Sequence, residues 1–321
     1  MIAAAQALEM ARAYLAAKDR PADDLKVVTD TSDFFRVDYH DVLLLETGAY
    51  LILGHEHEGR FGLDDQMKPW VKKAVDLYAG DRKVIKLVFA ERFDMKIGPM
   101  SYACFRSPKK EARILDLVRG HPNFMQGFST EDIKGNNVRI IDYVYGPSLH
   151  QFISEQDQPH EEYYHWTLPR ILDLLLPALD GLAFLHRRLE KHGDVRRDHL
   201  ICSREGRLVW IDFDFNYRHG EYLAGPDLAG VGNILGFLAG GGDWTLRKIK
   251  ERRPQILDSL RQEDMNIIFG HRLMNLGKLF PYFSPRLNDI LLHFSAGTEV
   301  FYGSVDELLS DLKRAREELP A

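Results

Sequence analysis

Two acidic residues, Asp194 and Asp212, each lie where a polar segment adjoins a short apolar strand. Asp194 belongs to a polar run over residues 192–199, directly before an apolar strand that begins at Leu200. Asp212 follows the apolar run 208–211, after a short turn. Because two strands joined by a turn bring their ends together, both carboxylates could face one cleft. One could orient or deprotonate a hydroxyl, and the other could hold a divalent cation on phosphate groups.

An exposed loop with solvated charges is the alternative explanation for such acids. Against it, hydrophobic residues surround Asp212 and Asp214, namely Val209, Trp210, Ile211, Phe213 and Phe215. Burying such a strand draws its acids toward the interior, where an unpaired charge is costly. On these residues alone, a functional site and a solvated loop both stay open.

The elements that would position these acids change in character along the chain. The first part favours strands, expected at 34–37, 41–46, 49–54, 70–77, 83–89 and 138–144. Helices are expected over 3–18 and over 109–119, the second because Gly120 and Pro122 form a stop signal. The later part is mostly helical, with one β interruption at 200–215 and an amphipathic tail helix at 304–318. Strands followed by helices predict an α+β protein.

Composition narrows the classes of function. The 321 residues include 48 acidic and 42 basic ones, a net charge of -6 that gives no reason to expect nonspecific nucleic-acid binding. The most apolar stretch, 168–189, is too polar to span a bilayer, because it contains Asp173, Asp180, Arg187 and Arg188. Two cysteines without a pairing pattern favour a reducing compartment. We therefore expect a cytoplasmic protein with no nucleic-acid or membrane partner.

The two acidic segments resemble the catalytic loop and the metal-binding loop of the protein-kinase-like superfamily, with their His-Arg-Asp and Asp-Phe-Gly motifs. The separation of Asp194 and Asp212 fits that family. Other segments resemble its remaining motifs in the right order. They are the lysine strand at 83–86, the helix-C segment at 110–115, the interlobe hinge at 141–149, the helix before the catalytic loop at 182–186 and the buried helix at 225–232. The tail is similar to the last helices of bacterial serine/threonine kinases.

The resemblance implies a two-lobed α+β fold, with a small antiparallel-sheet N-lobe and a helical C-lobe. Residues 1–40 would form an N-terminal helical extension, 41–145 the N-lobe and 146–321 the C-lobe. It also implies ATP as cofactor, with Mg²⁺ or Mn²⁺. The partner would be a hydroxyl acceptor, on a protein or a small molecule, that receives the γ-phosphate; a protein hydroxyl is slightly favoured.

Each matching residue receives a role from the same resemblance. Lys86, held by Glu111, would bind the α- and β-phosphates, and Asp212 would bind the metal. Asp194 would orient the acceptor hydroxyl, and Arg196 would steady the transferring group. The remaining nucleotide contacts would fall on Val71, Asp142, Val144, Gly59 and Gly62. For the lysine and the glutamate, an ordinary surface ion pair is the alternative.

Several positions depart from the family's pattern. His199 stands where the family has a metal-binding asparagine, so we expect it to shift the metal preference toward manganese. Gly193 and Asp214 replace the arginine and the glycine of the two motifs, as in aminoglycoside and choline phosphotransferases, and Asp214 becomes a further candidate metal ligand. The glycine-rich loop is irregular. The segment 214–227 is short and has no Ala-Pro-Glu, so we expect no dependence on activation-loop phosphorylation.

Two other classes of function stay open. A pseudokinase, acting as a nucleotide-binding or scaffold module, would also explain His199 and the irregular glycine loop. A metal-dependent phosphohydrolase could use His186, His192, Asp198 and His199. The order of Asp198 and His199 reverses the usual His-Asp pair, and the preceding motifs would go unexplained.

Overall fold

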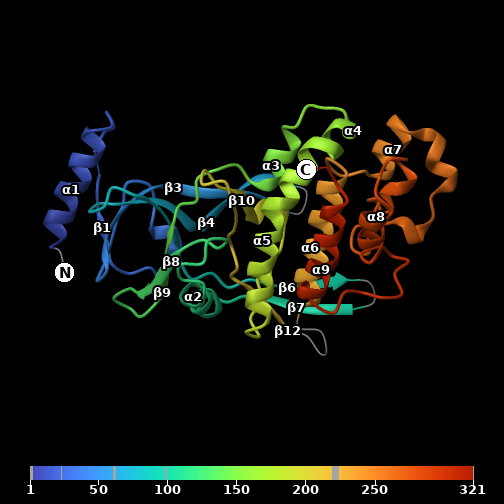
Figure 1. The fold of residues 1–321 in the computed structure, drawn as a ribbon. Helices are drawn as coiled ribbons and strands as arrows, with labels where there is room; N and C mark the ends of the chain where they lie inside the picture. Colours follow the sequence, from blue (N-terminus) through green and yellow to red (C-terminus); the bar gives the residue numbers. More distant parts are fainter. Residues whose placement is uncertain (1–2, 23, 61–62, 98–99, 219–223, 321) are drawn as a thin grey trace. The chain divides into compact units, whose positions relative to one another are not determined.

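A computed structural model describes residues 3–22, 24–60, 63–97, 100–218 and 224–320 (Figure 1). Its contacts divide the chain into two compact units, which we call the sheet unit and the helical unit. The sheet unit comprises Met1–Glu91, Arg106–His121 and Met125–Tyr143. The helical unit comprises Arg92–Phe105, Pro122–Phe124 and Val144–Ala321. The expected α+β fold, with a sheet-rich front and a helical back, is confirmed.

The sheet unit is built on a seven-stranded sheet. In spatial order its strands are β1 (Val27–Val28), β2 (Val42–Leu45), β3 (Gly48–Arg60), β4 (Leu63–Asp76), β5 (Arg82–Lys86), β9 (Asn137–Asp142) and β8 (Gly127–Glu131). β1 pairs with β2 in parallel, and the neighbours from β2 to β8 are antiparallel. The turn between β4 and β5 contains Gly80 at φ 74°, a left-handed conformation that glycine adopts without steric cost.

Two helices pack on this sheet, α1 (Ala4–Ala16) and α2 (Pro108–Leu117). α1 buries Ala7, Ala11 and Leu15, which share one face at four-residue spacing, in a cluster with residues of β2, β3 and β4. This helix is therefore part of the sheet unit. α2 packs beside β8 and β9. The Ser107 hydroxyl caps it by accepting the Lys110 N–H at 3.3 Å.

The strand expected at 34–37 is wrong. Phe34–Arg36 forms a 3₁₀ turn (η1) instead. The Asp33 carboxylate accepts the N–H of Phe35 at 3.0 Å, a local bond that competes with strand pairing. The buried Lys72 of β4 then donates to the carbonyl oxygens of Phe34 and Val37, which ties the turn to the sheet.

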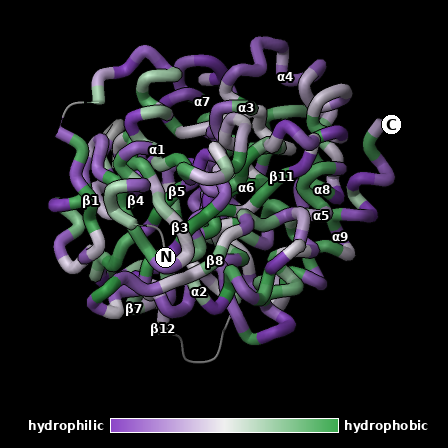
Figure 2. The backbone as a smooth tube through the Cα atoms, turned by 90° about the vertical axis from the view of Figure 1, so that its left-hand side faces the viewer, coloured by the Kyte–Doolittle hydropathy of each residue, from purple (hydrophilic) through white to green (hydrophobic). Residues whose placement is uncertain are grey.

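The helical unit contains most of the helices. They are α3 (Leu149–Ser154), α4 (His160–Glu162), a π-helical turn η2 (Tyr163–Thr167), α5 (Leu168–His186), α6 (Gly225–Ala239), α7 (Leu246–Arg252), α8 (Pro285–Leu292) and α9 (Val305–Glu317). Short 3₁₀ turns lie at Arg197–His199 (η3), Pro254–Ser259 (η4), Gln262–Asp264 (η5) and Leu276–Lys278 (η6). α6 is mostly apolar (Figure 2). It is buried along almost its whole length, and it packs against α8. Within the described ranges, no helix combines the length and hydrophobicity needed to cross a membrane.

Two small sheets complete the helical unit. β10 (Leu200–Cys202) pairs antiparallel with β11 (Leu208–Trp210). β6 (Arg92–Ile97) and β7 (Met100–Arg106) form a hairpin, and β12 (Phe215–Arg218) pairs with β7. The hairpin was not predicted. It lies in sequence between β5 and α2 of the sheet unit, yet its apolar face joins Tyr217 and Ala229 in a buried cluster of the helical unit.

Candidate active site

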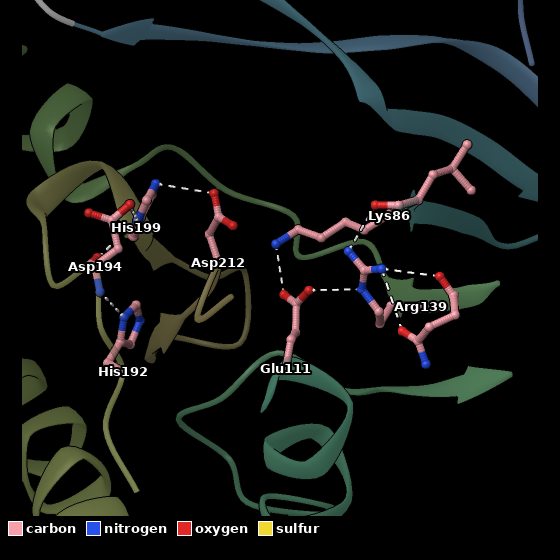
Figure 3. A network of polar contacts seen from close by, with 9 residues as sticks. Lys86, Glu111, Arg139, His192, Asp194, His199 and Asp212 are labelled. Carbon is pink, nitrogen blue, oxygen red and sulfur yellow. Dashed lines mark hydrogen bonds and ion pairs between the residues drawn. The ribbon is translucent and has the colours of Figure 1, made fainter. Parts of the chain in front are cut away.

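In the sheet unit, Lys86 and Glu111 form a buried ion pair (Figure 3). Lys86 Nζ donates to Glu111 Oε1 at 2.7 Å. The lysine is the last residue of β5, and the glutamate lies in the first turn of α2. Their exposed fractions are 4% and 0%, so they are not an ordinary surface pair.

Arg139 of β9 is a third member of this network, and the sequence analysis missed it. Its Nε donates to the second carboxylate oxygen of Glu111 at 3.1 Å, and its Nη2 donates to the Leu87 carbonyl at 3.1 Å. A single carboxylate thus lies between two cations, and Arg139 itself is 1% exposed. The signal was an arginine inside the apolar run 138–141, because a buried charge requires a partner.

The sheet register explains why these side chains meet. Val71 on β4 and Arg139 on β9 are both direct neighbours of Lys86 on β5. The three residues therefore form a row across three strands. Val71, the residue expected beside adenine, is 4% exposed and adjoins the lysine expected to hold the phosphates.

The other expected nucleotide contacts are dispersed. Asp142 ends β9, where its N–H donates to the Gln126 carbonyl at 2.9 Å and its carboxylate accepts Lys83 Nζ at 2.6 Å. Val144 is the first residue of the last segment of the helical unit. Gly59 lies in β3, close to the end of the long β3–β4 hairpin, and Gly62 lies outside the described residues. Their contact with a nucleotide stays a prediction.

In the helical unit, the loop that contains Asp194 is anchored on Asp227 of α6. The N–H groups of His192 and Gly193 donate to the two Asp227 carboxylate oxygens, each at 2.8 Å. His186 Nε2 lies 2.9 Å from the same carboxylate. Burial raises the pKa of Asp227, but the His186 hydrogen bond, the nearby histidine charges and the Gly193 N–H outweigh it and lower the pKa to about 2. The anchor is therefore ionised at neutral pH.

His199 lies between Asp194 and Asp212 (Figure 3). Its Nδ1 is 3.5 Å from Oδ2 of Asp194, and its Nε2 is 3.4 Å from Oδ2 of Asp212. The pairing of β10 with β11 produces this arrangement, because the Ile211 N–H donates to the His199 carbonyl at 3.0 Å. Asp194 and Asp212 thus face one site, and His199 and Asp212 are 4% and 8% exposed.

Arg196 adds a cation to this site. Its Nη2 lies 2.8 Å from His199 Nε2, and its Nε lies 3.5 Å from Oδ1 of Asp194. Burial lowers the pKa of Arg196, whereas the carboxylates of Asp212 and Asp198 oppose this change. Guanidinium groups stay protonated in proteins, so Arg196 carries its charge here.

Asp212 and Asp214 offer oxygen ligands for a metal. Their carboxylates each have an oxygen within 4.8 Å of the other, and both residues are buried. Asp212 has φ 62°, a left-handed conformation that is uncommon outside glycine and is found at functional sites. Carboxylate oxygens are the ligands that Mg²⁺ prefers, so this pair fits the divalent cation expected at the metal-binding loop.

The four residues of the phosphohydrolase alternative are not brought together. His186 and the backbone of His192 contact Asp227, and Asp198 contacts His150 with Nδ1 3.2 Å from its carboxylate. Across the part of the chain that the structure describes, they form no group whose ligand atoms lie within 4.8 Å of one another. The structure gives this alternative no support.

Comparisons with known proteins agree with the fold. No protein-family model matches the chain. It is 24% identical over 183 residues to mitogen-activated protein kinase kinase kinase 5 of Arabidopsis thaliana, covering 56% of this chain and 22% of that protein. It is 29% identical over 114 residues to serine/threonine-protein kinase STE20 of Saccharomyces cerevisiae, covering 34% and 11%. It is 22% identical over 169 residues to probable serine/threonine-protein kinase pknA2 of Bifidobacterium longum, covering 53% and 20%.

The chain therefore spans only about a fifth or less of the length of these relatives. The similarity is low but recurs across kinases of a plant, a yeast and a bacterium. Together with the division into a sheet unit and a helical unit, it supports assignment of the chain to the protein-kinase-like superfamily.

Proposed function

We propose that this protein is an ATP-dependent phosphotransferase that transfers the γ-phosphate of ATP to a hydroxyl group. The observation that carries the proposal is the buried ion pair of Lys86 and Glu111. Buried ion pairs contribute little to stability, because desolvation offsets their attraction. A lysine with 4% exposure, held by a glutamate with 0%, is better explained by a task that requires a fixed ammonium group. Binding phosphate is such a task.

The remaining roles follow from phosphoryl-transfer chemistry, which depends on positioning and on charge neutralisation. Asp212 and Asp214 hold a divalent cation, which neutralises phosphate charge when it is bound. Asp194 orients the acceptor hydroxyl and accepts its proton. Arg196 donates to the transferring group and offsets its developing charge. Val71 covers adenine from β4.

A protein serine or threonine is the acceptor that we favour, because the relatives named above are serine/threonine-protein kinases. Asp214 and the short segment 214–227 favour a small-molecule acceptor instead. ATP as the substrate, and two cysteines that form no disulfide, are consistent with the cytoplasm.

The first experiment is a thermal-unfolding measurement with ATP alone, ATP with Mg²⁺ and ATP with Mn²⁺. A ligand that binds only the folded state, at a hundred times its Kd, stabilises by about 2.7 kcal/mol. We expect a metal-dependent rise in melting temperature for the wild type that is absent in Asp212→Ala. Asp116→Ala, which removes an exposed carboxylate from α2, is the matched control and should respond as the wild type does.

Phosphate transfer is then followed as ADP release and as labelled product with protein and aminoglycoside acceptors. Transfer that is lost in Asp194→Asn, while the melting shift persists, would support the assigned roles. Nucleotide binding without transfer to any acceptor would favour the pseudokinase. The absence of any shift with ATP would discard the phosphotransferase proposal and leave a scaffold.

A further inference from the structure

The hydrogen bonds of His199 determine which of its ring nitrogens carries the proton. A guanidinium group can only donate, so Nε2, which lies 2.8 Å from Arg196 Nη2, must accept. A carbonyl oxygen can only accept, so Nδ1, which lies 3.0 Å from the Asp194 carbonyl, must donate. In this geometry Nε2 is the ring nitrogen that faces the guanidinium, and Nδ1 is the one that faces the carbonyl.

This arrangement directs Nε2 at Arg196. A metal ion bound by His199 would need that same nitrogen, because Nδ1 already contacts the Asp194 carbonyl. It would also approach Asp212, whose Oδ2 lies 3.4 Å from Nε2. A cation ligated by Nε2 and the Arg196 guanidinium therefore compete for one position, and they repel each other.

Resting on the phosphotransferase function proposed above, we propose that this site takes a single divalent cation, held by Asp212 and Asp214, and that Arg196 supplies the charge of a second one. His199 is then a positioning residue: it accepts the Arg196 N–H and holds the guanidinium next to Asp194. Protein kinases generally bind two magnesium ions at the corresponding site. In this arrangement His199 neither ligates a metal nor selects manganese, contrary to the expectation from its place in the sequence.

The chemistry of the side chains supports this exchange. A guanidinium is permanently charged, planar and well matched to phosphate oxygens, so it can neutralise a phosphoryl group as a metal does. The partial burial of Arg196 keeps this charge close to its partners, in contact with Asp194 as well as His199. An asparagine at position 199 would offer a hard oxygen ligand, whereas the imidazole observed here is a poor ligand for magnesium.

The first test is direct and needs no nucleotide. In protein labelled with ¹⁵N-histidine, long-range ¹H–¹⁵N spectra report the tautomer of each ring. The signals of His199 are identified as those that are missing from the spectrum of the His199→Asn variant. We expect Nδ1–H and an unprotonated Nε2 that accepts a hydrogen bond, with the same pattern after Mg²⁺ and a non-hydrolysable ATP analogue are added. A proton on Nε2, or a metal-dependent shift of Nε2 as large as ligation produces, would overturn the inference.

The second test counts Mn²⁺. Electron paramagnetic resonance of free Mn²⁺ gives the number bound per chain when the protein is saturated with the same ATP analogue. The wild type should bind one, and Asp212→Ala should bind none. Arg196→Ala, which releases the Nε2 lone pair, and His199→Asn, which supplies an oxygen ligand, should each gain a second, weaker site.

Two Mn²⁺ ions on the wild type would contradict the inference, and so would a failure of both variants to gain a site. If the protein binds no Mn²⁺ in the presence of the ATP analogue, both the proposed phosphotransferase function and the proposed single cation are contradicted. The tautomer measurement on the nucleotide-free protein still reports the Arg196–His199 contact by itself, so the two failures are distinguishable.

Discussion

Glu111 is completely buried and has two cationic partners, so the stability of the fold depends on keeping both of them. Its carboxylate accepts from Lys86 at 2.7 Å and from Arg139 at 3.1 Å. Removing one member of a buried ionic group leaves the others imperfectly compensated, which costs more than the contact itself contributed. The kinase-like motifs led to Lys86 and Glu111, because a motif records residue types in order. They could not lead to Arg139, whose role depends on the register of β5 with β9.

At the residue scale, we predict that Arg139→Met lowers the free energy of unfolding by about 3 to 5 kcal/mol. The substitution removes a donor from Glu111 and from the Leu87 carbonyl without leaving a large cavity. Urea denaturation followed by circular dichroism measures the loss.

Arg119→Met provides the matched control. Arg119 contacts Asp116 with an N–O distance of 2.7 Å, as short as the Lys86–Glu111 contact, but their side chains are 71% and 66% exposed. Exposed ion pairs contribute little, so this variant should unfold at almost the wild-type urea concentration. Equal effects of the two substitutions would show that the Arg139 contacts have no special weight.

At the scale of elements, α6 determines the position of the loop that contains Asp194. Asp227 in its first turn binds the backbone of His192 and Gly193. One turn later, Gly230 allows the carbonyl of Val195 to lie against the helix backbone. A methyl group on Gly230 would overlap that carbonyl oxygen, which is main chain and cannot rotate away as a side chain can.

We predict that Gly230→Ala destabilises the protein by about 2 kcal/mol or more, because overpacking against backbone forces a shift. The displaced segment includes Asp194, so phosphate transfer should fall as well. Gly236→Ala in the same helix is the control, since its methyl group would meet only the flexible Met274 side chain, at 3.0 Å from Sδ. Alanine is also the better helix former by about 1 kcal/mol. If the melting curves of the two variants coincide, this explanation is refuted.

Elements with local signals were predictable, and elements with distant partners were not. The tail helix and α2 begin at serine caps, and they were predicted to within one or two residues. The β6–β7 hairpin carried a local signal that was overlooked, since Phe93, Met95 and Ile97 alternate with charged residues. Its pairing with β12, more than a hundred residues later, has no trace in the local sequence. The contact of Arg196 with His199 likewise required the three-dimensional arrangement of their side chains.

At the scale of the whole molecule, the half-buried His160 and the buried Asp227 connect stability to pH. His160 Nε2 lies 2.9 Å from the Ala239 carbonyl, its Nδ1 lies 2.8 Å from the Tyr282 hydroxyl, and its ring stacks on Phe280. Burial lowers the pKa of His160 to about 4. The pKa of Asp227 is about 2, so its contribution is lost only in stronger acid, as the pH falls from 3.8 toward 2.

We predict that the free energy of unfolding falls as the pH is lowered from 6.5 to 4, and that this loss depends on His160. Above pH 6.5 the residue is neutral in both states; as the pH falls toward 4, the unfolded chain binds a proton that the folded protein excludes, so unfolding becomes more favourable. The full effect is at most about 3 kcal/mol. Urea denaturation at a series of pH values measures it. His160→Gln should flatten the profile in this window, and an unchanged profile would assign the pH dependence to other groups.

The β6–β7 hairpin has a consequence for biosynthesis. Its buried face includes Tyr102 and Cys104, whereas the covering residues Tyr217 and Ala229 follow more than a hundred residues later in the chain. At the usual pace of translation, the ribosome needs on the order of ten seconds to add that stretch. During this interval the hairpin is synthesised but its apolar face has no native partner. Until then, either a chaperone binds the exposed apolar face or the sheet unit folds while the hairpin is still unpacked. The helical unit can be completed only after α6 has been synthesised.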